Sequence, residues 1–134
     1  QKEVAQRICA PAGKSEYGAF SVFCQYYAEP RLLFDVPPSC FIPQPKVTSA
    51  VLKLTMRDAP PCPIPDERLF FRVVKASFAQ RRKTLVNALS SGFGEFTKQQ
   101  LSGAIEAAGF SPTVRGETLD IPSFAAVCRE LLKL

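Results

Sequence analysis

The sequence predicts an α/β plus all-α fold, in which a short α/β unit precedes a small helical bundle. Within residues 1–58, two helical patterns are followed by two apolar strands. Residues 59–65 contain four prolines, and a segment of this composition behaves as a semi-rigid spacer. Residues 66–134 read as helices joined by turns. We therefore predict two units, 1–58 and 66–134, joined by the proline-rich linker 59–65.

The first unit is expected to open with two helices. Residues 2–10 place apolar side chains at helical spacing, and Pro11 begins the segment that ends the pattern. Residues 17–28 are apolar around most of a helical circumference, which indicates a helix buried on several sides. Tyr26 and Tyr27 are accordingly expected in the core. Pro30 ends this helix.

Two strands and a stiff loop complete the first unit. Residues 31–36 form an apolar run that ends at two consecutive prolines, which predicts a strand. Residues 39–46 carry alternate prolines that forbid a helix and favour an extended, rigid path. Residues 47–57 are rich in apolar side chains and predict a second strand.

Four amphipathic helices are expected in the second unit. The first covers residues 66–80, and the next begins near Arg81 or Arg82. The third is preceded by a capping box formed by Thr97 and Gln100, and Asp120 caps the last. The side chains of the last helix that should face inward are Phe124, Val127, Leu131 and Leu132.

Composition excludes several kinds of chemistry. The chain has no histidine, which removes the usual general base and the Ser/His and Cys/His catalytic pairs. Its five cysteines are an odd number without a CxxC pair, so we expect free thiols in a reducing cytoplasm and no metal site. No apolar run approaches the roughly 20 residues that a membrane span requires, so we expect no membrane association.

Positive charge is concentrated in one part of the chain. The net charge is +5, and six lysines and arginines lie between Glu67 and Glu95 with no acidic residue among them. Arg81, Arg82 and Lys83 are consecutive, and such a cluster suits contacts with phosphate oxygens. The alternative is a solvated charged face, which is the commoner fate of a charge run.

Four segments together resemble one protein family. They are QKEVAQR (1–7), SVFCQYY (21–27), FIPQPKVTSAV (41–51) and FAQRRKTLVNAL (78–89). These segments are similar to motifs of the bacterial small-subunit ribosomal RNA adenine N6,N6-dimethyltransferases. The resemblance implies that residues 1–58 are the C-terminal part of a Rossmann-like class I methyltransferase domain, and that residues 66–134 are a helical rRNA-binding domain.

The resemblance also implies a reaction. The family uses S-adenosylmethionine, without a metal, to dimethylate two adjacent adenosines near the 3′ end of small-subunit rRNA during ribosome biogenesis. Its glycine-rich loop for the methyl donor and its Asn-Leu-Pro-Tyr motif do not occur in this sequence. We therefore expect the N-terminal part of a longer protein to bind the donor, and this chain alone to be inactive.

Site residues follow from the same resemblance. Phe41 is expected to stack on the target adenine after the base leaves its helix, although it could instead fill the core. The residues expected to contact RNA are Arg81, Arg82, Lys83, Asn87 and Lys46. Lys83 and Asn87 should share one helical face. Lys46 is equally compatible with a plain surface position.

The expected partners are small-subunit rRNA and the pre-ribosomal small subunit. Without preceding strands, the first unit would expose an unpaired strand edge, which favours self-association of the chain. One alternative function is a stand-alone basic nucleic-acid-binding module without catalysis. Another is a family member used in transcription or ribosome assembly instead of methylation.

Overall fold

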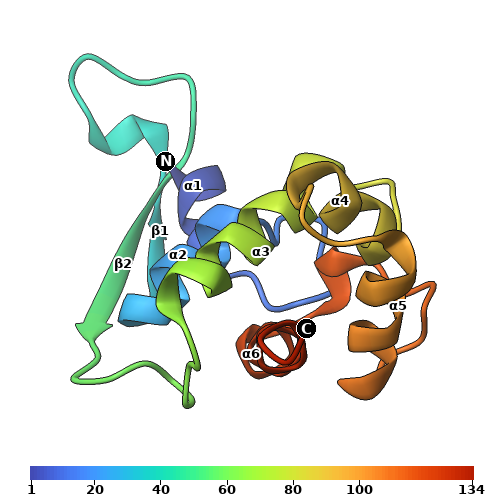
Figure 1. Cartoon of the computed structure of the whole chain (residues 1–134). Helices are drawn as coiled ribbons and strands as arrows, with labels where there is room; N and C mark the ends of the chain where they lie inside the picture. The colour runs from blue at the N-terminus through green and yellow to red at the C-terminus, as the bar shows by residue number, and fades with distance from the viewer.

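The computed structural model describes residues 1–134 and contains six α-helices and one two-stranded sheet (Figure 1). The elements of the first half are α1 (Lys2–Cys9), α2 (Ala19–Tyr27), β1 (Ala28–Val36), the 3-10 helix η1 (Pro38–Cys40) and β2 (Ser49–Met56). Those of the second half are α3 (Glu67–Ala79), α4 (Leu85–Gly92), α5 (Lys98–Ala107), the 3-10 helix η2 (Gly116–Thr118) and α6 (Ile121–Leu131). The predicted order of helices and strands is confirmed. None of these helices has the length and apolar character that crossing a bilayer would require.

The two strands form an antiparallel hairpin that is interrupted by a bulge between Leu32 and Phe34. β1 begins three residues earlier than expected, directly after α2, and Pro30 pairs with Leu54 inside the strand. A proline is tolerated here because β1 has a partner on one side only, so that its other edge needs no N–H donor.

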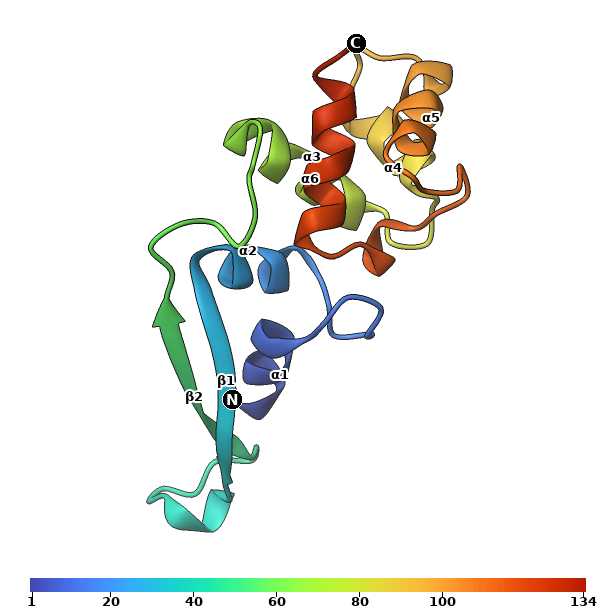
Figure 2. The ribbon, with the colours of Figure 1, turned by 90° about the horizontal axis from the view of Figure 1, so that it is seen from below.

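Helices α1 and α2 pack beside the hairpin (Figure 2). Tyr26 is buried, as expected, but α2 is less enclosed than its composition indicates. Phe20 and Phe23 are 50% and 51% exposed, and Tyr27 is exposed as well, so the prediction of burial on several sides is wrong for this face. Phe23 and Tyr27 on this face lie beside one aromatic residue of α3, Phe71.

The second half consists of α3, α4, α5 and α6, and their starts agree with local capping chemistry. The side chains of Asp66, Thr97 and Asp120 each accept a hydrogen bond from a backbone N–H in the first turn of α3, α5 and α6. The Thr97–Gln100 capping box is confirmed. Leu132 is exposed and lies just beyond α6, so its predicted inward position is wrong.

The start of α4 differs from the prediction. The helix begins at Leu85 and not at Arg81 or Arg82, because the Thr84 hydroxyl accepts a hydrogen bond from the backbone N–H of Asn87 and caps the helix there. Residues 80–84 therefore form a turn between α3 and α4, which we call the basic turn.

One buried cluster joins the two halves of the chain. Four of its residues lie before the linker: Ala10, Tyr17, Val22 and Tyr26. The others come from α3 to α6 and their connections. The ring of Tyr26 lies 5.4 Å from that of Phe70. The hydroxyl of Tyr17 donates a hydrogen bond of 2.7 Å to the carbonyl of Leu119. The segment before the linker and the helices after it are thus held together by buried contacts.

Candidate nucleic-acid interface

The basic turn has a defined backbone conformation. α3 ends at Ala79, and Gln80 leaves the helical region with φ −135° and ψ 73°. The N–H of Lys83 donates to the carbonyl of Gln80 at 3.1 Å, and the N–H of Leu85 donates to the carbonyl of Val114 at 2.7 Å. These bonds fix the turn between two helices, so its side chains project from a supported backbone.

Arg82 and Lys83 are exposed, and neither side chain has a hydrogen bond or ion pair within the protein. Asn87 is also exposed, and only its backbone N–H and carbonyl make hydrogen bonds. Two unpaired cations and one free amide at the start of α4 can bind phosphate and ribose oxygens without breaking an existing contact.

Arg81 differs from its two neighbours because its side chain is engaged. Its Nη2 atom donates to the carbonyls of Tyr17 at 2.8 Å and Ser15 at 3.2 Å, and lies 3.9 Å from a carboxylate oxygen of Glu117. No acidic residue is close to the basic run in sequence, but the fold brings Glu117 to it. The structure therefore divides the predicted cluster into one paired and two unpaired cations.

Arg115 supports the basic turn and was not among the predicted site residues. Its Nη2 donates to the backbone carbonyl of Arg81 at 2.6 Å, and its Nε lies 3.1 Å from a carboxylate oxygen of Glu117. Arg115 and Glu117 are two positions apart in sequence and form an ion pair. No sequence signal indicated that Arg115 reaches a carbonyl 34 positions away.

Phe41 lies in the long loop that joins β1 to β2. η1 precedes it, and the N–H of Phe41 donates to the carbonyl of Pro38 at 3.2 Å. The side chain is 42% exposed and belongs to no aromatic pair or buried cluster. The loop continues through a cis peptide bond between Ile42 and Pro43. A half-exposed ring in a proline-rich loop is accessible to a flat apolar partner such as a nucleobase.

Lys46 occupies the same loop and is exposed, with no hydrogen bond or ion pair. The loop lies at the end of the hairpin that is remote from α3 to α6, near the start of α1, whereas the basic turn joins α3 to α4 (Figure 2). Phe41 and Lys46 thus share one loop, and Arg82 and Lys83 lie just before the helix that carries Asn87, but the two groups lie in different parts of the molecule. Because α4 begins at Leu85, the prediction that Lys83 and Asn87 share one helical face is wrong.

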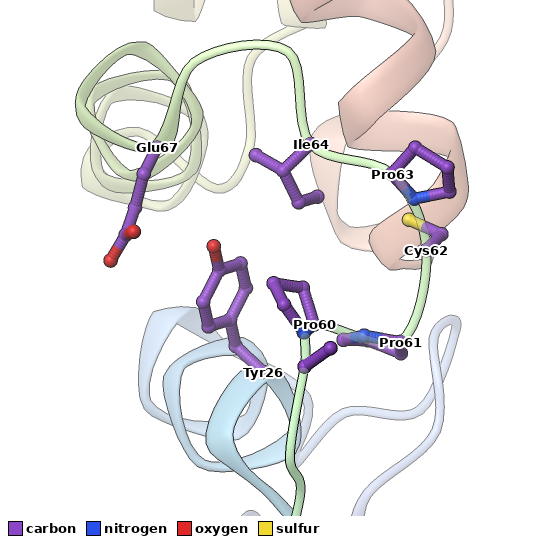
Figure 3. Close-up of a pocket in the computed structure, with 8 residues that line it drawn as sticks. Tyr26, Pro60, Pro61, Cys62, Pro63, Ile64 and Glu67 are labelled. Atoms are coloured by element: carbon purple, nitrogen blue, oxygen red, sulfur yellow. The ribbon is translucent and has the colours of Figure 1, made fainter.

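The largest hollow, of about 590 Å³, lies where the linker passes from the first half to the second. Figure 3 shows the ring of Tyr26 and the side chains of Pro60 and Ile64 around it, with Glu67 of α3 at one side. Burial, together with Glu67 and other nearby groups, raises the pKa of Tyr26. The lining is mainly apolar and holds no group of donors and acceptors arranged to orient a polar ligand.

All five cysteines are free, and four of them are at least partly buried. Burial raises the pKa of Cys9, Cys24 and Cys62, and raises that of Cys128 to about 12. Such thiols are poor nucleophiles and poor metal ligands at neutral pH. No three His, Cys, Asp or Glu side chains are placed to hold a metal ion.

The residues present do not fit S-adenosylmethionine. In methyltransferases of the family that the sequence resembles, a glycine-rich loop after a strand holds this donor. Here β1 is followed by Pro37 and β2 by Arg57, and no glycine lies directly beyond either strand. The hollow beside the linker offers a single carboxylate. No step of methyl transfer can be assigned to side chains of this chain.

Comparison with known sequences gives a consistent result. The family profile described as "Ribosomal RNA adenine dimethylase" matches residues 1–125. A ribosomal RNA small subunit methyltransferase A from Geobacillus thermodenitrificans is 47% identical over 136 residues, covering 100% of this chain and 46% of the relative. The corresponding protein of Moorella thermoacetica is 49% identical, covering 98% of this chain and 45% of the relative. The chain therefore spans less than half the length of these curated relatives.

Solved structures of similar fold are more distant in sequence. A dimethyladenosine transferase from Plasmodium falciparum matches with a TM-score of 0.76 at 21% identity, over 99% of this chain and 55% of that chain. The 23S rRNA methyltransferase ErmE matches with a TM-score of 0.67 at 18% identity, over 98% of this chain and 52% of that chain. In both, the region similar to this chain is about half of the larger protein.

Proposed function

Since this chain belongs to the ribosomal RNA adenine dimethylase family, we propose that it docks such an enzyme on ribosomal RNA and contributes one side chain to the target-base pocket. The observation that carries the proposal is the basic turn. Arg82 and Lys83 are exposed and unpaired there, on a backbone that neighbouring loops hold in place. Cations presented in this way neutralise phosphates and set the register of the protein on RNA.

The activity we propose for the longer protein is dimethylation of two adjacent adenosines near the 3′ end of small-subunit rRNA. The name of the bacterial relatives, ribosomal RNA small subunit methyltransferase A, supports the substrate class. S-adenosylmethionine would supply the methyl groups. Residues outside this chain would hold it, and this chain alone is expected to be inactive.

Phe41 would stack on the target adenine once the base has left its helix. Its exposure and its place in a proline-rich loop support this role. Stacking of a base on an aromatic ring is worth about 1–3 kcal/mol. Lys46 would contact the RNA backbone beside the same base. Asn87 would make a further polar contact with the RNA beside Lys83.

The proposed domain division keeps residues 1–58 as the end of a Rossmann-like class I methyltransferase domain, 59–65 as linker and 66–134 as the helical rRNA-binding domain. The likeness in fold to two rRNA methyltransferases supports the first assignment. The pre-ribosomal small subunit is the expected partner, in the cytoplasm and without a metal or membrane. Self-association through the open edge of the hairpin also stays a prediction.

Salt dependence of RNA binding tests the docking role. The chain would be titrated with small subunits that lack dimethyladenosine, from 50 to about 200 mM salt. Replacing Arg82 and Lys83 by Ala should weaken binding and reduce the slope of log K against log salt by about 1.4–1.8, because two phosphate contacts are lost.

The matched control removes two exposed lysines elsewhere, Lys98 and Lys133, and should leave the slope nearly unchanged. Equal slopes for all three proteins would contradict the docking role. The methyl-transfer role needs the longer protein, the donor and undermethylated small subunits. If no dimethyladenosine forms, the chain is better described as a basic nucleic-acid-binding module.

A further inference from the structure

We propose that Arg81 is a positioning residue, which holds the basic turn against the loop between α1 and α2 and does not itself bind RNA. The loop comprises residues 10–18. Within the basic turn, only Arg82 and Lys83 would then meet phosphate. This second half of the inference rests on the docking function proposed above, whereas the first half rests on the contacts of Arg81 alone.

The loop between α1 and α2 is inserted into the second half of the protein through Tyr17. This side chain is 2% exposed, and its hydroxyl donates to the carbonyl of Leu119. Its ring lies edge-on to Phe78 near the end of α3, with 5.6 Å between the ring centroids. The N–H of Gly13, in the same loop, donates to the carbonyl of Glu117 at 2.9 Å. These contacts therefore fix the position of the loop beside the basic turn.

The side chain of Arg81 also holds this loop in place. One of its guanidinium nitrogens donates to two loop carbonyls, those of Tyr17 at 2.8 Å and Ser15 at 3.2 Å. The guanidinium carbon lies 5.6 Å from the ring centroid of Phe78. The backbone also approaches closely, since a Cβ atom added to Gly18 would lie 3.4 Å from Nη1 of Arg81. The two carbonyls belong to residues 64 and 66 positions away in sequence.

The side chain of Arg81 is 40% exposed, and neighbouring groups of the protein partly neutralise its charge. Two carbonyl dipoles and the carboxylate of Glu117 face its guanidinium, and a phosphate would have to compete with them. Arg82 and Lys83 have no such partners. Counterion release scales with the cations that phosphate newly pairs, so Arg81 should contribute little to the salt dependence of RNA binding.

The backbone of Arg81 is held as well as its side chain. Arg115 donates to the Arg81 carbonyl at 2.6 Å while it pairs with Glu117. The turn is thus connected through Arg81 to the first half of the chain, and through Arg115 to the segment before α6. This arrangement sets the direction in which Arg82 and Lys83 project relative to the unit that carries Phe41.

Matched substitutions separate a positioning role from direct RNA contact. Arg81→Gln and Arg82→Gln each remove one charge while keeping an amide donor. For Arg82→Gln the salt slope should fall by about 0.7–0.9. For Arg81→Gln the slope should be unchanged, and binding should weaken about threefold at every salt concentration because the remaining cations are misaligned. Lys98→Gln serves as the charge-matched control.

Hydrogen exchange of the folded chain tests the contact itself, without RNA. In Arg81→Gln, the amides of Tyr17 and Gly18 should exchange about tenfold faster, since the loop has lost its charged donor. Arg81→Lys should restore part of this protection, because an ammonium group can donate to both carbonyls. In Arg82→Gln, the same amides should exchange at the rate seen in the unsubstituted chain.

The outcomes are distinguishable. A salt slope that falls as much for Arg81→Gln as for Arg82→Gln, with loop exchange unchanged, would overturn the positioning role and make Arg81 an RNA contact. Faster loop exchange with undiminished RNA affinity would also overturn it, because Arg81 would then stabilise the loop without aligning the turn. If none of the variants alters RNA binding, the docking function fails, while the exchange data still decide whether Arg81 holds the loop.

Discussion

Arg81, Arg82 and Lys83 are adjacent in sequence but differ in their surroundings. All three are exposed, but only Arg81 donates hydrogen bonds to carbonyls of the first half of the chain. Tyr17 shows the same dependence on tertiary partners. The sequence places it at the start of a buried helix, whereas in the structure it lies in the loop before α2, where its ring is buried and its hydroxyl donates to the carbonyl of Leu119. At the scale of single residues, the partner across the fold decides the role of a side chain.

Tyr17→Phe is expected to destabilise the chain by about 1–3 kcal/mol near pH 8, because the carbonyl of Leu119 loses its buried donor. Burial, and secondarily Asp120, raises the pKa of Tyr17 above its ordinary value of about 10. Above about pH 10 the unfolded chain loses the Tyr17 proton while the folded chain keeps it, so stability falls as pH rises. Tyr17→Phe has no phenolic proton to lose at this position. The difference in the free energy of unfolding between the two proteins should therefore narrow above about pH 10. Urea unfolding of both proteins at several pH values measures this difference.

If the free energies of unfolding of the unsubstituted chain and of Tyr17→Phe differ by a constant amount from pH 8 to about pH 11, this account of Tyr17 is contradicted. Tyr27→Phe is a suitable comparison, since the hydroxyl of Tyr27 donates to Glu67 on an exposed surface. Its effect should be smaller than that of Tyr17→Phe, because solvent replaces the lost partner.

At the scale of elements, local chemistry explains where most helices begin and packing explains how they meet. Thr97 and Asp120 cap α5 and α6 as their sequence positions indicate, and Asp66 caps α3. The α3–α4 contact depends on a small residue at the end of α4. A Cβ atom at Gly92 would lie 2.8 Å from the Cβ of Ala76, which no relaxed structure accommodates.

Gly92→Ala should therefore destabilise the chain by about 1–3 kcal/mol through overpacking, although Ala is normally the better helix former. Ala76→Gly removes the opposing methyl group and costs about 1 kcal/mol by itself, because Gly is unfavourable within α3. The double variant should be more stable than the sum of the two single effects predicts. Denaturant unfolding of the four proteins gives the coupling, and strictly additive effects would refute the steric explanation.

At the scale of the whole molecule, the buried cluster is continuous across the linker. Val22 and Tyr26 lie in the same cluster as Phe70 and Phe124. The linker covers one side of this junction, where Ile64 packs against the cluster. Two units that share buried side chains should not unfold independently, even though their sequences read as separate units.

Thermal and denaturant unfolding should therefore show a single transition, which two spectroscopic probes follow in the same way. The three tyrosines all lie before the linker and the chain has no tryptophan, so tyrosine fluorescence reports on the first half. Four of the six α-helices lie after the linker, so circular dichroism at 222 nm reports mainly on the second half. The two midpoints should coincide. An earlier tyrosine transition would mean that the first half unfolds separately.

The sequence by itself determined the features that depend on neighbouring residues and on motifs. Helix caps, proline breaks and strand runs involve contacts within a few positions, and the four motif segments identified the family before any fold was known. Only the tertiary structure decided that Phe20 and Phe23 are exposed and that Arg81 is paired. The reason is physical: burial and ion pairing depend on segments that are distant in sequence, and no local pattern records which of them meet. The division of the basic turn into one paired and two unpaired cations belongs to that second class.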